Sequence, residues 1–401
     1  MLQDKKIVLG VTGSIAAYKA ADLTRELIKR GAAVKIVMTK NAAEFITPLT
    51  LQTLSGHAVY FDMFSPATEY DIDHISLASY ADILVIAPAS ANIIGKIASG
   101  LADDLLSTVV MTTRAPVLIC PAMNTDMYDN VIVQNNISNL KNTGYFFMEP
   151  GYGGLACKAE GRGRLPDVPD IVDEIEAILA EKDFVGEHVL VTAGPTREPF
   201  DPVRFITNYS SGKMGYALAI AARKRGAIVT LISGPTSLPV PNGIMFMPVS
   251  SAFEMKNAVM KHLKSATVII KAAAVADYRP AIRSESKIKK RQGPLAVTLE
   301  RNPDIIAEVG KKKGNRVLVG FAVETENLVK NARAKLQKKN MDLIVANDVT
   351  QEGAGFGSDT NIVRILDNKG GQLDLPMMGK MEVANRILDR IREIIAAKKR
   401  K

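Results

Sequence analysis

Cysteine and long apolar runs are scarce in this chain of 401 residues, tryptophan is absent, and these scarcities exclude several classes of protein. The two cysteines, Cys120 and Cys157, cannot form a disulfide framework, and their spacing matches no CxxC metal motif. No run reaches about 18 consecutive apolar residues, which argues against a membrane-spanning helix. Residues 1–6 lead directly into a strand-like segment without signal-peptide features, so we expect a reducing, cytoplasmic compartment.

The residues that are present have the composition of an ordinary globular protein, with 47% hydrophobic and 23% charged residues. At roughly 100–200 residues per domain, the length favours two domains. The net charge of +9 is divided unevenly, because residues 1–186 carry 15 basic and 22 acidic residues and the remainder carries 36 and 20. This asymmetry predicts two units with different ligands, the second of which binds an anion such as a nucleoside triphosphate or a nucleic acid.

Short apolar segments alternate with helical patterns in both halves of the chain. The predicted strands are apolar runs at residues 6–11, 34–39, 83–87, 117–120, 188–194 and 228–232. The predicted helices cover residues 15–30, 171–181 and 211–225. This alternation is typical of a mostly parallel sheet covered on both faces. We therefore predict two doubly wound, Rossmann-like α/β domains, 1–186 and 187–401.

The first predicted strand is followed by a glycine-rich turn, residues 10–15 (GVTGSI), that opens a helix. A helix N-terminus attracts anions through its free N–H groups and its dipole. The turn is not GxGxxG, and the next strand ends at Thr39-Lys40 without the acidic residue that binds the ribose of NAD. A nicotinamide cofactor is therefore disfavoured. Two interpretations stay open, a hydroxyl-lined mononucleotide site and a turn that only reverses the chain.

Further polar groups follow the later strands of the first half, where open α/β sheets bind ligands. They are the segments DHI at 73–75, APASANIIGKIASGLADDLL at 87–106 and PAMNTDMY at 121–128, with GGLAC at 153–157. A lone histidine or buried cysteine is usually structural. Cys157, however, has glycines before it and Lys158 after it, a setting that suits a thiol that donates a proton.

Together with TGSIAAYK at residues 12–19, these segments resemble the flavin-dependent cysteine decarboxylases, and in particular the phosphopantothenoylcysteine decarboxylase domain of coenzyme A biosynthesis. The resemblance spans residues 1–185. Two positions depart from the family's pattern, since its SANTIAK is SANIIGK here and its PxMNxxMW ends in Tyr128. The resemblance implies a flavodoxin-like flavoprotein domain that binds FMN.

The family's chemistry assigns roles to these residues. Loss of CO₂ from a saturated carbon needs an electron sink, which a cofactor usually supplies. The resemblance implies that His74 assists thiol oxidation and decarboxylation, that Asn124 holds the substrate carboxylate, and that Cys157 gives the final proton. The implied flavin-lining residues are Gly13, Ser14, Ile15, Thr39, Ser90, Asn92 and Ala122.

The second half contains the string SGKM at residues 211–214, but it is not a phosphate loop, because GxxxxGK[ST] fails at Thr207 and at Met214. Other polar segments follow its strands: TAGPTREP, DPVRFITNYSSGKMG, KAAAVADY, KIKK, NPDI, GFA and AKLQKK. Lys335 and Lys339 at i,i+4 can also share a wet helix face, and the runs 287–291 and 311–313 can be solvated charges. Nucleic acid is disfavoured, since the lysines lack interleaved aromatics and no recognised module is present.

Most of these segments, in this order across residues 188–365, resemble the phosphopantothenate–cysteine ligase domain. The resemblance implies that Asn208 and Arg204 hold an acyl-nucleotide intermediate and that Lys287 takes part in its conversion. It implies Mg²⁺ and CTP as ligands, with Asp277 positioning the metal or the nucleotide. The remaining implied nucleotide-binding residues are Lys287, Asn302, Pro303, Asp304, Ile305, Phe321, Lys335 and Lys339.

The two resemblances together predict a bifunctional enzyme. The second domain joins 4′-phosphopantothenate to cysteine with CTP through an acyl-cytidylate, and the first decarboxylates the product with FMN. The family pattern implies a homo-oligomer, with trimers of the decarboxylase and dimers of the ligase. Two alternatives are a flavoprotein that decarboxylates peptidyl cysteine and a non-enzymatic regulatory flavoprotein. No chemistry is assigned to residues 366–401.

Overall fold

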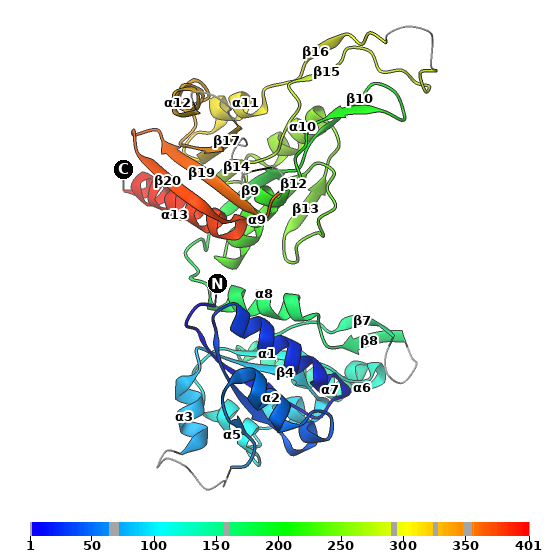
Figure 1. The fold of residues 1–401 in the computed structure, drawn as a ribbon, viewed down its shortest axis with the longest axis vertical. Helices are drawn as coiled ribbons and strands as arrows, with labels where there is room; N and C mark the ends of the chain where they lie inside the picture. The colour runs from blue at the N-terminus through cyan, green and yellow to red at the C-terminus, as the bar shows by residue number, and fades with distance from the viewer. Residues whose placement is uncertain are drawn as a thin grey trace. The chain divides into compact units, whose positions relative to one another are not determined.

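The structure is a computed structural model that describes residues 2–63, 72–154, 160–289, 295–323, 328–347, 355 and 357–400 (Figure 1). The chain divides into two compact units, Met1–Ala180 and Glu181–Lys401. The boundary predicted near residue 186 falls shortly after this division. Within the described ranges, every helix is too short or too polar to span a bilayer.

The first unit is built on a six-stranded parallel sheet with the order β3-β2-β1-β4-β5-β6. Its strands are β1 (Lys6–Val11), β2 (Ala33–Met38), β3 (Val59–Tyr60), β4 (Ile83–Ala89), β5 (Val117–Pro121) and β6 (Phe146–Phe147). Its helices are α1 (Lys19–Lys29), α2 (Pro48–Ser55), α3 (Asp73–Tyr80), α4 (Ala91–Ala98), α5 (Leu105–Thr112), α6 (Thr125–Asp129), α7 (Val131–Asn142) and α8 (Val168–Leu179). A hairpin, β7 (Gly151–Gly154) and β8 (Glu160–Arg164), precedes α8.

Both faces of this sheet are buried, as the continuous apolar strands predict. Alternate residues of a strand point to opposite faces. Ile7 and Leu9 of β1 therefore pack with α1 and α8, whereas Val8 joins the cluster formed with α4 and α5. The helix predicted over 15–30 is observed as a 3-10 turn, Ile15–Tyr18, capped by the Ser14 side chain, followed by α1.

The second unit contains an eight-stranded sheet with the order β13-β12-β9-β14-β17-β18-β19-β20. The parallel strands are β9 (His188–Ala193), β12 (Ile228–Ser233), β13 (Met245–Pro248), β14 (Val268–Lys271), β17 (Val317–Val323) and β18 (Leu343–Asn347). Strands β19 (Thr360–Asp367) and β20 (Gln372–Gly379) extend the sheet in antiparallel fashion. The sequence analysis assigned no strand to this region.

Helices cover both faces of the second sheet as well. One face packs on α9 (Lys213–Lys224) and α13 (Lys380–Lys399), and the other on α10 (Ala252–His262), α11 (Ile305–Lys312) and α12 (Leu328–Lys338). Two small hairpins extend from this unit: β10 (Arg197–Pro199) with β11 (Phe205–Thr207), and β15 (Tyr278–Pro280) with β16 (Leu299–Arg301). These packed layers confirm the predicted α/β fold class for both halves.

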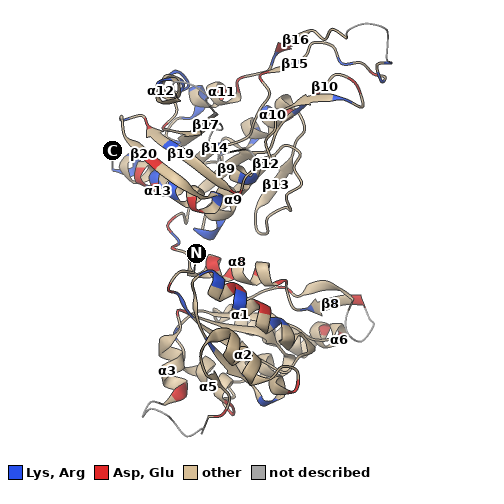
Figure 2. Cartoon of the chain, in the orientation of Figure 1, with Lys and Arg blue, Asp and Glu red and all other residues tan. Residues whose placement is uncertain are grey.

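The C-terminal helix α13 carries many charged side chains (Figure 2). Arg392 pairs with Asp183 at 2.6 Å, a carboxylate that also binds Arg225. Closer to the end of the helix, Lys398 pairs with Asp342 at 3.0 Å and Lys399 with Glu187 at 2.9 Å. The basic tail, for which the sequence suggested no role, thus ties α13 to the start and the centre of its own unit.

Each sheet contains one position at which the chain reverses the direction of strand order. In the first unit, β1 lies between β2 and β4, and in the second, β9 lies between β12 and β14. The connections leave such neighbouring strands toward opposite faces, so a crevice forms at their carboxyl ends. This topology predicts one ligand site beside β1 and β4 and another beside β9 and β14.

Candidate active sites

A cavity of about 570 Å³ lies at the carboxyl ends of β1, β4 and β5 in the first unit. Its walls include Gly13, Ser14, Ile15, Ser90 and Ala122, which the sequence analysis assigned to flavin. The cavity also has apolar walls, contributed by Phe45, Met123, Met127 and Leu165. The turns after three strands thus meet around one space.

Hydroxyl groups hold these turns together. The Thr12 hydroxyl donates to the carbonyl of Pro88 at 2.8 Å and accepts from the Ser90 N–H at 3.0 Å, which joins the turn after β1 to the turn after β4. The Ser14 hydroxyl donates to the carbonyl of Ala122 at 3.1 Å. Thr12 is buried and had no role in the sequence analysis, although its place in the glycine-rich turn was a usable signal.

Two residues assigned to flavin do not line the cavity. Asn92 is exposed in the first turn of α4. Thr39 follows β2, and its N–H donates to the carbonyl of Val11 at 3.0 Å, which places it beside the first turn. Within the described part of the chain, the buried Thr39 hydroxyl has no hydrogen-bond partner. A buried hydroxyl without a partner is costly, so it is a candidate contact for a ligand.

Asn124 lines the cavity and also caps helix α6. Its Oδ1 accepts hydrogen bonds from the N–H groups of Asp126 at 2.8 Å and Met127 at 3.4 Å. The adjacent wall is Gly163 of β8, whose carbonyl accepts from the Met123 N–H at 3.0 Å. Gly163 has φ of +143°, and a Cβ there would lie 2.1 Å from the Met123 carbonyl oxygen. The wall therefore requires glycine.

The other predicted decarboxylase residues are not part of this cavity as described. His74 lies in the first turn of α3, half-buried, and does not line the space. Cys157 falls in the segment 155–159 between β7 and β8, outside the described residues.

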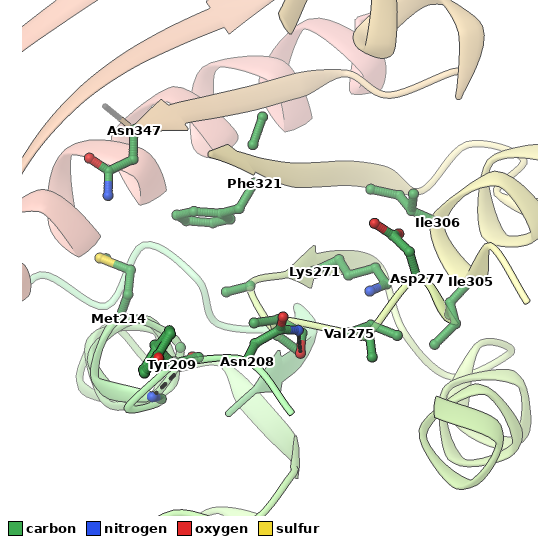
Figure 3. A pocket seen from close by; sticks show the side chains of 18 of the residues that line it. Asn208, Tyr209, Met214, Lys271, Val275, Asp277, Ile305, Ile306, Phe321 and Asn347 are labelled. Atoms are coloured by element: carbon green, nitrogen blue, oxygen red, sulfur yellow. Dashed lines mark hydrogen bonds between the residues drawn. The ribbon is translucent and has the colours of Figure 1, made fainter. Parts of the chain in front are cut away.

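A second cavity, of about 730 Å³, lies at the carboxyl end of the second sheet (Figure 3). It is lined by residues from the turns after several strands and by the starts of α9 and α11. The predicted residues among them are Asn208, Asp277, Asn302, Pro303, Asp304, Ile305, Phe321, Lys335 and Lys339.

Hydrogen bonds to backbone groups orient the polar residues of this cavity. Asn208 donates through Nδ2 to the carbonyl of Ala274 at 3.0 Å, and Asn302 donates to the carbonyl of Ala276 at 2.8 Å. Asp304 accepts from the Ala307 N–H at 3.1 Å, which caps α11, and pairs with Lys339 at 3.0 Å. Burial is the largest single influence on Asp304 and opposes its ionisation, but the hydrogen bonds from Lys339 and the Ala307 N–H and the charges of Lys339 and Lys271 together outweigh it, so the pKa of the carboxyl is lowered. The carboxylate is therefore charged at neutral pH.

The cavity also contains lysines to which the sequence analysis gave no role, namely Lys213, Lys271 and Lys380. Lys213 pairs with Asp359 at 2.6 Å, and Lys380, the first residue of α13, hydrogen-bonds the carbonyl of Ser358. Burial and the nearby Lys213 lower the pKa of Lys380. The string SGKM was a signal for Lys213, but nothing near Lys380 in the sequence pointed to a ligand site.

Arg204 and Lys287 do not line the second cavity, although both were predicted to act there. Instead, Asp201 brings their segments together. Its buried carboxylate accepts from Arg204 Nε at 3.0 Å and Nη2 at 2.6 Å, and from the Ile288 N–H at 3.2 Å. Arg204 also donates to the Ile288 carbonyl at 2.9 Å, next to Lys287. The hydrogen bond from Arg204 holds the pKa of Asp201 well below its usual range.

Comparison with known families assigns each half of the chain to a family of its own. Residues 1–180 match the family described as Flavoprotein, and residues 184–395 match the DNA/pantothenate metabolism flavoprotein C-terminal domain. The coenzyme A biosynthesis bifunctional protein CoaBC of Bacillus subtilis (strain 168) is 50% identical over 395 residues, 98% of this chain and 97% of the relative. The same-named protein of Escherichia coli (strain K12) is 46% identical, over 97% of each chain.

Solved structures resemble each unit separately. The C-terminal domain of a CoaBC protein is 42% identical and covers 54% of this chain and 100% of its own, with a TM-score of 0.47. A mutant PPC decarboxylase complexed with pantothenoylaminoethenethiol is 31% identical and covers 43% of this chain and 97% of its own, with a TM-score of 0.40.

The relatives match both halves, which favours the predicted bifunctional enzyme over a decarboxylase of peptides or a regulatory flavoprotein. The chain belongs to the family of bifunctional coenzyme A biosynthesis proteins, in which a flavoprotein decarboxylase domain precedes a phosphopantothenate–cysteine ligase domain.

Proposed function

We propose that the second unit couples 4′-phosphopantothenate to cysteine with CTP and Mg²⁺, and that the first unit decarboxylates the product with FMN. The observation that carries this proposal is the contrast between two cavities at equivalent sheet positions. One has apolar walls and hydroxyl-bearing turns, and the other is lined by several lysines.

The residues of the first cavity fit FMN. The apolar walls suit a flat ring system, and the Ser90 hydroxyl, which accepts from the Ile93 N–H at 3.5 Å, keeps its own proton to donate to a polar group of the flavin. The Thr39 hydroxyl, without a partner among the described residues, is a further donor beside the first turn. When bound, FMN supplies the electron sink that decarboxylation of a saturated carbon requires.

The chain's own residues then position the substrate and supply a proton. Because Oδ1 of Asn124 caps α6, its Nδ2 is the atom that would donate to the substrate carboxylate. Cys157 would deliver a proton to the enethiolate left after CO₂ departs. Replacing Cys157 with serine should therefore leave flavin binding and CO₂ release in place and stop at an oxidised product. Normal turnover by that variant would remove Cys157 from the mechanism.

The ligase reaction proceeds in two displacements. The phosphopantothenate carboxylate attacks the α-phosphorus of CTP and pyrophosphate leaves. The cysteine amine then attacks the acyl carbon, CMP leaves, and the amine loses a proton. Negative charge on the phosphates is stabilised by Lys335, Lys339, Lys287 and Mg²⁺. Within the described residues, no cluster of three or more acidic, histidine or cysteine side chains forms a metal site. Asp277 would therefore contact a Mg²⁺ ion that binds together with the phosphates.

The other predicted residues frame the substrates. Asn302, Pro303, Asp304, Ile305 and Phe321 surround the nucleoside. Asn208 holds the acyl-cytidylate by its amide, which the Ala274 carbonyl orients. Arg204 and Lys287 lie apart from the cavity of their own chain. They would therefore reach the cavity of a second copy in the proposed ligase dimer.

We also propose that the decarboxylase sites form between copies, as in trimers. His74 does not line the cavity, and Ile15, Tyr18 and Met127, all of which line it, are exposed apolar side chains. Exposed apolar groups around a functional cavity are typical of a surface that another subunit covers.

One assay tests the function of both cavities. The purified protein should be yellow and release FMN on denaturation. It should release pyrophosphate from CTP only when phosphopantothenate is present, and more slowly from ATP, GTP or UTP. A colourless protein after FMN reconstitution would contradict the decarboxylase, and pyrophosphate release independent of phosphopantothenate would contradict the ligase.

A further inference from the structure

Lys271 is a cavity residue that the mechanism above does not use. It is the last residue of β14, where it pairs in register with Thr192 of β9 and with Gly320 of β17. It thus lies at the point where the strand order reverses. Val268 and Ile270 pack on one face of the sheet and Ile269 on the other, so alternation places Lys271 on the face of Ile269, which α11 and α12 cover.

The charged groups that face Lys271 come from three places in the fold. Asp304 precedes α11, Lys339 follows α12, and Asp277 lies in the loop after β14. Figure 3 shows the Lys271 amino group on the side of the cavity occupied by Asp277, Ile305 and Ile306. Asp304 is already paired with Lys339 at 3.0 Å. Among the described residues, no carboxylate lies within ion-pair distance of the Lys271 amino group.

This environment disfavours the ammonium form. Burial is the main cause, and Lys339 adds repulsion, so the pKa of Lys271 is lowered to about 8 although Asp304 and Asp277 act in the opposite direction. A partly desolvated ammonium without an ion-pair partner destabilises the folded state. An apolar residue at the end of a buried strand would avoid that cost, so the lysine is better explained by a ligand than by the fold.

The balance of charged residues in the cavity indicates whether that ligand is an anion or a cation. Its basic lining residues are Arg301, Lys213, Lys271, Lys335, Lys339 and Lys380, and its acidic ones are Asp277 and Asp304. An excess of cations around one space suits a polyanion, since each phosphate oxygen offers a charge-assisted hydrogen bond. Lys271 belongs to this set and lies at the end of β14, between β9 and β17.

We propose that Lys271 is a further nucleotide-binding residue of the ligase, and that its amino group binds a phosphate oxygen of the nucleoside triphosphate. The inference rests on the proposed nucleotide-dependent ligation. The nucleotide is favoured over the phosphate of phosphopantothenate because Asp304 and Lys339, whose charges act on Lys271, both belong to the proposed nucleotide site.

A measurable consequence is coupling between nucleotide binding and protonation. At pH 8, part of the Lys271 population is neutral, and a bound triphosphate favours the charged form. Binding should therefore take up a proton near pH 8, and affinity for the nucleotide should fall as the pH rises further.

The test is calorimetric titration of the full-length protein with CTP at pH 8 in buffers of different ionisation enthalpy. Lys271→Met should weaken CTP binding at least about tenfold and remove the part of the proton uptake that Lys271 contributes. Lys271→Arg, which stays charged, should retain most of the affinity but also lose that part of the uptake. The matched control is Lys311→Met on the exposed surface of α11, which removes one charge outside the cavity and should change neither quantity.

Titration with phosphopantothenate alone distinguishes the two sources of phosphate. The inference predicts unchanged phosphopantothenate binding in Lys271→Met, and a loss confined to that ligand would overturn it. CTP binding by Lys271→Met within twofold of wild type, or proton uptake in Lys271→Arg equal to that of the wild type, would also overturn it while leaving the ligase function intact. Failure of the wild-type protein to bind CTP would overturn the proposed function and this inference together.

Discussion

The two units place their cavities at the same topological position but line them with different chemistry. In both, the cavity lies beside the first strand of the sheet and the strand that follows the reversal, β1 with β4 and β9 with β14. The first cavity is bounded by glycines, hydroxyls and apolar side chains. The second is bounded by basic side chains, and its acidic residues are few. The sheet therefore determines where a ligand binds, and the residues after each strand determine which ligand it is.

The two units also fix their turns by a similar device. Thr12 hydrogen-bonds both Pro88 and Ser90 across the first crevice. In the second unit, Thr192 accepts from the Ala273 N–H at 3.3 Å and Thr196 from the Ala276 N–H at 3.0 Å. In each case, threonine hydroxyls from the first strand and its turn anchor the loop of the strand across the crevice. Such anchoring keeps the ligand-binding loops rigid before the ligand arrives.

The largest expected effect is the loss of one activity, ligation, while the other, decarboxylation, is retained. Asn208→Asp replaces the amide that holds the proposed acyl-cytidylate with a carboxylate, which cannot donate to the Ala274 carbonyl and so no longer orients the intermediate for attack by cysteine. Ligation should fall about 100-fold or more, with acyl-cytidylate accumulating on the enzyme, while decarboxylation of added substrate continues. Quenched-flow analysis of enzyme-bound nucleotide measures the intermediate.

Asn257→Asp is the matched control for that change, because it adds the same charge on the exposed surface of α10. It should ligate at the wild-type rate. Rapid and complete consumption of the intermediate by Asn208→Asp would contradict the role given to Asn208.

A smaller effect should follow from releasing Arg204 and Lys287, which have no counterpart in the first unit. Asp201→Asn removes the charge that holds Arg204 and weakens the bond to the Ile288 N–H. The ligase kcat should fall about 10- to 100-fold and CTP affinity by a smaller factor, because the residues that line the cavity within the same chain are unchanged. Asp374→Asn, which breaks an exposed pair with Arg364, is the control and should leave kcat unchanged.

Asp201→Asn also tests a prediction about how the stability of the fold depends on pH. The pKa of Asp201 is lowered in the folded protein, so the stability it contributes is present above its unfolded pKa of about 4 and is lost as the pH falls below it. Wild-type protein should therefore lose stability in acid more steeply than Asp201→Asn, as measured by melting temperature between pH 3 and 6. Equal slopes would show that the Asp201–Arg204 pair does not stabilise the fold.

Much of the fold could be predicted from the sequence because it depends on local patterns. Apolar runs such as residues 83–87 and 117–120 are buried on both faces, and they became β4 and β5 of the parallel sheet. Strands β19 and β20 were missed. The exposed residues of β20 alternate irregularly with buried ones, so the strand lacks a clear period of two. A strand that joins a sheet edge in antiparallel fashion is also not part of a βα repeat, which is the pattern that predicted the other strands.

The candidate sites were predicted less completely, for a physical reason. Motif resemblance identified residues such as Asn208 and Phe321 that line the second cavity. It could not place Lys380, which approaches that cavity from α13 far along the chain, nor show that Asp201 joins Arg204 to the segment of Lys287. Contacts of this kind depend on tertiary packing, which no local pattern encodes.

The smallest expected effect concerns the Thr39 hydroxyl of the first unit. Thr39→Val preserves the shape of the side chain and removes a hydroxyl that has no partner among the described residues. Because no protein hydrogen bond is lost, the melting temperature of the apoprotein should stay the same or rise. If the hydroxyl binds FMN, affinity for FMN should fall about five- to tenfold, as measured by quenching of flavin fluorescence.

The matched control for this change is Thr24→Val in α1, where the buried hydroxyl donates to the Ala20 carbonyl at 2.7 Å. It should lower the melting temperature through the loss of about 1 kcal/mol of hydrogen bonding, while FMN affinity stays at the wild-type value. If a hydroxyl without a protein partner binds the ligand and a hydrogen-bonded one stabilises the fold, the two variants give opposite results. Thr39→Val then lowers only FMN affinity, and Thr24→Val lowers only the melting temperature. Thr39→Val with lower stability and unchanged FMN affinity would instead make Thr39 a structural residue, and the flavin site would then be confined to the turns after β1, β4 and β5.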